Sequence, residues 1–170
     1  MQRLKSSHFG IFDLIIIDTP YDGSCFFHAI LRCLNTKYIS SSPQNKSLIA
    51  KELRYDLSEK LSSELDNLED FGYSDVKSLL RSNSPMGYEI LEPICKMLNI
   101  NIYIVFSQTK DLYPFGRGVS LYDKNRSSII IYYDNNHYQS IGIIEKNELK
   151  THFSEDHGLI LNINKKLNLQ

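Results

Sequence analysis

Four short runs of β-branched and aromatic residues constrain the fold of this chain more than any other feature. Asp, Asn, Gly or Pro residues lie at or near the ends of these runs, and this pattern is typical of strands rather than of helices. The runs are 11–17, 100–106, 129–133 and 138–144. The polar segment 134–136 separates the last two and predicts a hairpin. These runs predict a small sheet.

Between these runs, apolar residues recur at helical spacing. The spacing predicts helices that start at Cys25 and that cover 49–68, 74–80 and 87–98. Segments 35–47 and 107–127 are rich in turn-forming residues and are expected to be loops, the second with room for a short strand. This order of elements predicts an α+β fold with helices packed on a small, mostly antiparallel sheet.

Size and composition indicate one globular domain. A chain of 170 residues that is 42% hydrophobic can fill a single core, so we expect one domain over 1–170. The net charge of −1 argues against nucleic acid as the main partner. No apolar run approaches the roughly eighteen residues of a membrane span, and no signal peptide is visible, so no membrane association is expected. The three cysteines are an odd number, which favours a reducing, cytoplasmic compartment over a disulfide framework.

One cysteine lies where thiol chemistry is favoured. Cys25 follows the turn Asp22-Gly23-Ser24 and lies at or near the start of a predicted helix. The free N–H groups and the dipole of a helix start favour the thiolate, which is the nucleophilic form. The backbone N–H groups of Gly23, Ser24 and Cys25 are candidates for an oxyanion hole. Cys33 and Cys95 fall among apolar helical residues, so we expect them in the core.

His137 is the candidate general base. It precedes the alternating strand 138–144 and lies 112 residues after Cys25, so only folding can bring the two side chains together. Papain-like enzymes also place the cysteine before the histidine in the chain.

Three motifs resemble those of the ovarian tumour (OTU) family of deubiquitinating cysteine proteases. Residues 22–29 (DGSCFFHA) resemble the nucleophile motif D-G-x-C-L/F-F-x-A, and residues 137–141 (HYQSI) resemble the histidine motif H-Y-x-S-V/I. Residues 86–90 (MGYEI), followed by a predicted helix and strand, are similar to the W-G-G-x-E segment. The resemblance covers 18–144 and leaves 145–170 as a C-terminal extension.

The resemblance implies an OTU-like fold, with a small sheet between helical lobes, and a function. Such an enzyme is a monomer that hydrolyses the isopeptide bond after the C-terminal glycine of ubiquitin, of polyubiquitin or of a ubiquitin-like modifier. Cys25 would attack that carbonyl, and His137 would act as general base and then as general acid. No metal and no organic cofactor is required.

The third catalytic member departs from the family pattern. Many relatives place Asp or Asn two residues after the histidine, where this chain has Gln139. A glutamine oxygen could orient the imidazole, and the other candidates are Asp22, Asp18 and Asp13. We expect Asp22 to be functionally necessary. His28 stands where relatives often carry Arg, and we expect it to pack or to contact substrate.

Further expectations concern the substrate and the chain end. Glu89, Tyr138 and the loop 107–127 are candidate substrate contacts, and 158–163 is a candidate added strand or docking segment. Two alternative functions remain open. The chain could be a catalytically weak or inactive ubiquitin-binding module, or a cysteine protease that acts on ordinary peptides.

Overall fold

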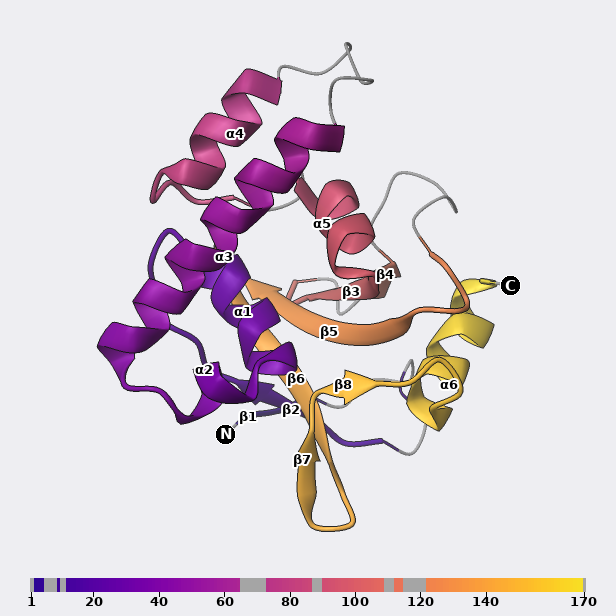
Figure 1. The fold of residues 1–170 in the computed structure, drawn as a ribbon. Coiled ribbons are helices and arrows are strands. Elements are labelled where there is room, and N and C mark those ends of the chain that lie inside the picture. Colours follow the sequence, from indigo (N-terminus) through magenta and orange to yellow (C-terminus); the bar gives the residue numbers. More distant parts are fainter. Residues whose placement is uncertain are drawn as a thin grey trace.

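The computed structural model describes residues 2–4, 9, 12–64, 73–86, 90–108, 112–114 and 122–169. Their centre is an eight-stranded sheet (Figure 1). Its main path runs β1 (Gln2–Leu4), β2 (Leu14–Ile17), β6 (His137–Glu145), β5 (Ser127–Asp134), β3 (Ile100–Phe106) and β4 (Leu112–Pro114). Two short strands, β7 (Glu148–Lys150) and β8 (His152–Phe153), pair with β6 and β5. Neighbours are antiparallel except β3 and β5, which confirms the expected fold class.

Helices cover both faces of this sheet (Figure 1). One face carries α1 (Cys25–Leu34), α2 (Thr36–Ser40), α3 (Pro43–Glu64), α4 (Tyr73–Arg81) and α5 (Leu91–Leu98), and the other carries α6 (Gly158–Leu167). Side chains of a strand alternate between faces, so β3 and β5 supply two cores. Ile102 and Ile129 pack under the first group of helices, whereas Tyr103 and Ile130 pack with α6. Across the described residues, no helix combines the length and the apolarity that a membrane crossing needs.

Segment 35–47 corrects the sequence prediction, because it holds α2 and the start of α3 instead of a loop. The Asn35 side chain accepts a hydrogen bond from the Tyr38 N–H and so caps α2. Pro43 then occupies the first position of α3, where a missing N–H has no cost. The predicted helix 49–68 therefore begins earlier, and Leu65 and Leu68 lie outside the described residues.

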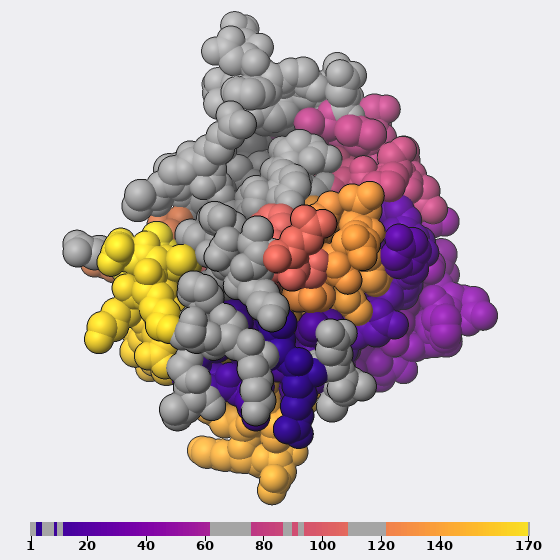
Figure 2. Space-filling model, turned by 180° about the vertical axis from the view of Figure 1, so that it is seen from behind, coloured from indigo at the N-terminus to yellow at the C-terminus, as the bar shows by residue number. Residues whose placement is uncertain are grey.

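The C-terminal extension is a second correction, because 158–163 is helical. Leu159, Ile160 and Ile163 are fully or almost fully buried, and their spacing is that of one helix face. His157 Nδ1 accepts the Leu159 N–H and caps the helix. Seen from behind, α6 lies at one side of the molecule, and the β6–β7 hairpin projects below it (Figure 2). Much of the extension is thus part of the packed fold.

Candidate active site

Cys25 is the first residue of α1. Two hydroxyl groups, one on β6 and one between β7 and β8, donate hydrogen bonds to carbonyl groups of this helix. Ser140 Oγ on β6 donates to Ala29 O at 3.0 Å, and Thr151 Oγ1 donates to Cys33 O at 3.1 Å. A backbone hydrogen bond from Tyr138 reaches the Cys25 thiol, which is 5% exposed. The thiol therefore lies beside the residue that follows His137.

The protonation of Cys25 differs from the sequence prediction. Burial raises the pKa of this thiol, and the charge of Asp22 raises it further, whereas backbone hydrogen bonds from Tyr138 and Phe26 oppose the rise. Desolvation thus outweighs the helix start. A thiol with a raised pKa is protonated at neutral pH, so a thiolate forms here only when a base takes the proton. Burial raises the pKa of Cys33 to about 12, in keeping with its expected place in the core.

His137 is the first residue of β6, and its two ring nitrogens have different surroundings. Nε2 lies 3.6 Å from Asp18 Oδ1, and the ring packs on Tyr21 with centroids 4.6 Å apart. Nδ1 is buried and has no hydrogen-bond partner among the described residues. With Nε2 directed at a carboxylate, Nδ1 is the nitrogen left to accept a proton from a nearby thiol.

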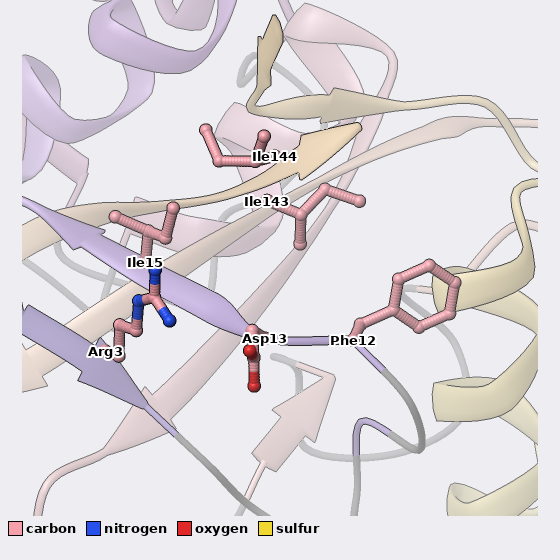
Figure 3. Close-up of a pocket in the computed structure, with 6 residues that line it drawn as sticks. All are labelled: Arg3, Phe12, Asp13, Ile15, Ile143 and Ile144. Carbon is pink, nitrogen blue, oxygen red and sulfur yellow. The ribbon is translucent and has the colours of Figure 1, made fainter. Parts of the chain in front are cut away.

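Asp18 is the carboxylate that lies beside the imidazole. Gln139 Nε2 donates to Asp18 Oδ1 at 2.9 Å, so Gln139 binds the carboxylate that lies beside the histidine. The antiparallel register of β2 and β6 explains this, because Ile17, the last residue of β2, faces Ser140, and Asp18 directly after it therefore reaches Gln139. The same register directs Asp13 to the opposite end of the pair. There Asp13, with Arg3, Phe12, Ile15, Ile143 and Ile144, lines a separate cavity of about 260 Å³ (Figure 3).

Asp22 holds the nucleophile turn, which we define as residues 22–25. Its Oδ1 accepts the Ser24 N–H at 2.7 Å, and its Oδ2 lies 3.2 Å from His28 Nε2. His28 is fully buried, and its Nδ1 contacts the Tyr38 hydroxyl at 2.8 Å. Burial lowers the pKa of His28 against the opposing effect of Asp22. His28 therefore packs inside the protein, and the hydrogen bonds of Asp22 hold the turn and His28.

The oxyanion-hole prediction needs a correction at Ser24 and at Cys25. The Ser24 N–H is taken by the Asp22 carboxylate, and the Cys25 N–H donates to Asp22 O at 3.2 Å. Both N–H groups therefore donate to Asp22 within the nucleophile turn in this structure. The Gly23 N–H stays a prediction.

Sequence reasoning missed Arg54, which lies behind the nucleophile turn. Its side chain is 1% exposed, and its Nη1 donates to Gly23 O and Ser24 Oγ. The signal was the spacing, because Arg54 shares the buried face of α3 with Ala50, Leu57 and Leu61. A charged residue in an apolar stripe marks a buried polar interaction.

A cavity of about 490 Å³ borders the imidazole. It is lined by Asp18, Thr19, Pro20, Tyr21, Pro43, Lys46 and His137. Tyr138, a predicted substrate contact, is 5% exposed and packs between the rings of Phe26 and Tyr133, so its side chain belongs to the core. Glu89 and two stretches of the loop 107–127, residues 109–111 and 115–121, lie outside the described residues.

The fold is that of OTU domains. No family model and no curated protein sequence matches the chain. An OTU domain solved in complex with ubiquitin is 21% identical, with a TM-score of 0.66 over 96% of this chain and 87% of that one. The viral OTU domain protease of Taggert virus is 14% identical, with a TM-score of 0.53 over 88% and 96%. The Hazara virus OTU bound to ubiquitin is 15% identical, with a TM-score of 0.52 over 78% and 83%.

Proposed function

We propose that this protein is a cysteine-type deubiquitinase that cleaves the bond after the C-terminal glycine of ubiquitin. The observation that carries the proposal is the placement of Cys25 at the start of α1, beside the strand that begins with His137. The unpartnered Nδ1 of His137 and the neighbouring Asp18 supply the base and a carboxylate to stabilise it. The OTU fold, seen in structures solved with ubiquitin, supports the choice of substrate.

Each half of the reaction passes one proton through His137, first from the Cys25 thiol to the lysine amine and then from water to the leaving Cys25 sulfur. His137 Nδ1 takes the proton of the Cys25 thiol as the sulfur attacks the glycine carbonyl. The imidazolium, held by Asp18, then gives this proton to the departing lysine amine, and a thioester to Cys25 forms. Water activated by the same nitrogen hydrolyses the thioester and frees ubiquitin and the thiol.

A panel of differently linked di-ubiquitins, together with ubiquitin that carries a C-terminal electrophile, tests this proposal. We expect cleavage of at least one linkage and covalent labelling at Cys25. Binding of ubiquitin with neither cleavage nor labelling would indicate an inactive ubiquitin-binding module. Cleavage of a peptide library that lacks the Leu-Arg-Gly-Gly sequence, with di-ubiquitin left intact, would indicate an ordinary peptidase.

Replacing Asp18 tests its role as the carboxylate partner of His137. We expect Asp18→Asn to lower kcat by about tenfold, less than for a buried triad carboxylate, because the Asp18 side chain is 86% exposed. The measurement is steady-state hydrolysis of ubiquitin with a fluorogenic C-terminal amide. Asp13→Asn is the matched control at the far end of β2 and should retain wild-type kcat. Equal kcat values for Asp18→Asn and Asp13→Asn would show that Asp18 has no role in the reaction.

A further inference from the structure

Arg54 has no part in the proton transfers above, although it lies directly behind the nucleophile. Its five hydrogen bonds match the five donors of a guanidinium. Nη1 donates to Gly23 O at 2.9 Å and to Ser24 Oγ at 3.0 Å. Nε and Nη2 donate to Leu80 O at 3.0 Å, Leu79 O at 2.6 Å and Ser84 O at 2.9 Å. One side chain therefore joins α3, the end of α4 and the nucleophile turn.

These contacts fix the peptide group between Gly23 and Ser24 from both sides. A trans peptide is planar, and its C=O and N–H point in opposite directions. Arg54 binds the carbonyl oxygen of this peptide, and Asp22 Oδ1 binds its N–H. Cys25 is one residue further on, and the hydrogen bond from its N–H to Asp22 O closes the turn, so the orientation of this plane is passed on to Cys25.

Arg54 is itself held firmly enough to act as a fixed support. Leu79 and Leu80 lie in the last turn of α4, where the helix dipole favours a cation. The guanidinium also lies over the Phe27 ring, 4.8 Å from its centroid.

The charge of Arg54 also acts on the nucleophile. All five acceptors are neutral oxygens, so these contacts leave the charge of the guanidinium uncancelled. Burial lowers the pKa of Arg54, while the negative charges of Asp22 and of the Cys25 thiolate raise it. Arg54 binds the two residues that precede Cys25, so its charge lies close enough to favour the thiolate, although burial and the charge of Asp22 outweigh this effect and the pKa of the thiol stays raised.

We propose that Arg54 is the positioning residue of the nucleophile: it fixes the Gly23–Ser24 peptide, directs Cys25 toward His137, and stabilises the thiolate. Lysine can supply the charge but cannot form this five-bond fork, so the two effects are separable. The kinetic part of the proposal rests on the proposed function, whereas the reactivity of Cys25 can be measured without any ubiquitin substrate.

The test compares Arg54→Lys and Arg54→Met with the same changes at Arg81. Arg81 also lies between α3 and α4, bound to Ser58 Oγ and Glu59, but no described contact of its side chain reaches the nucleophile turn. We expect Arg54→Lys to lower kcat roughly thirtyfold, with KM within about twofold, because the reacting sulfur is misplaced. We expect Arg54→Met to move the midpoint of Cys25 alkylation by iodoacetamide upward by about one pH unit, because the cation is lost. Alkylation is followed on the Cys25 peptide by mass spectrometry, and thermal unfolding reports folding.

A folded Arg54→Lys with wild-type kcat, or an equal loss of kcat in Arg81→Lys, overturns the proposal. An unchanged alkylation profile in folded Arg54→Met overturns the electrostatic part. If the Arg54 variants do not fold, Ser24→Ala removes one acceptor of Arg54, and Ser58→Ala is its match at Arg81. A loss of kcat of about threefold in Ser24→Ala alone supports the proposal, and equal rates overturn it. If the wild type cleaves no ubiquitin substrate, the proposed function is wrong, and the alkylation profiles still decide the role of Arg54.

Discussion

Cys25→Ala is expected to lower di-ubiquitin cleavage by about 10⁴-fold or more, because removal of a covalent nucleophile leaves only binding and electrostatic effects. Ubiquitin binding should persist, since a thiol that is 5% exposed contributes little surface to a partner. The measurements are gel-based cleavage of di-ubiquitin and titration of labelled ubiquitin with the same protein.

The matched control is Cys33→Ala, a second buried cysteine on the same helix. Its side chain packs in the core, so the change should cost some stability and leave kcat near that of the wild type. If Cys25→Ala retains cleavage, or if both variants lose it equally, Cys25 is not the nucleophile.

Burial of the thiol also predicts how the rate depends on pH. Because desolvation raises the pKa of Cys25, this thiol is protonated at neutral pH and does not form a stable ion pair with His137 in advance. Alkylation of Cys25 should therefore rise with pH into the alkaline range. A profile with a plateau below neutral pH would show that the thiolate is already formed and would contradict this picture.

The sequence predicted the sheet and the start of α1 at Cys25 well because both depend on local patterns. The run 100–106 alternates along its length, so its strand character follows from its own residues. The hairpin of β5 and β6 is similar, because Asn135 and Asn136 both tolerate the positive φ angles of 45° and 64° that the turn requires.

The features that the sequence did not predict depend on contacts between residues that are distant in the chain. Segment 158–163 has a strand-like composition and becomes helical because its apolar face covers the second core. The helical spacing places Arg54 on an apolar face, but its partners, which are carbonyl oxygens of α4 and of the nucleophile turn, come from distant parts of the chain. Asp18 reaches His137 only through the register of β2 and β6. No local sequence pattern shows which strands pair or in which register, so the sequence could offer Asp18 only as one of several candidates.

Gly23→Ala is expected to damage the site through packing alone. A Cβ at this position would lie 1.7 Å from Asn83 O and 2.9 Å from Asn83 C, which are backbone atoms that cannot rotate away. The loop that follows α4 or the nucleophile turn must therefore move, and Arg54 binds both of them. We expect a loss of about 2–4 kcal/mol in the free energy of unfolding. We also expect at least a roughly hundredfold loss of kcat, because Cys25 moves with the turn.

Gly158→Ala provides the comparison, since a Cβ there meets only the Phe12 ring, at 3.5 Å, which is an ordinary contact. Chemical denaturation and fluorogenic hydrolysis should separate the two variants clearly. If Gly23→Ala unfolds at the same denaturant concentration as Gly158→Ala and keeps its kcat, an added Cβ fits at Gly23, and the predicted clash with Asn83 is wrong. Loss of kcat with unchanged stability would instead mean that the added Cβ is accommodated without loss of packing but displaces the nucleophile turn. In that case the conformation of the turn itself sets the position of Cys25.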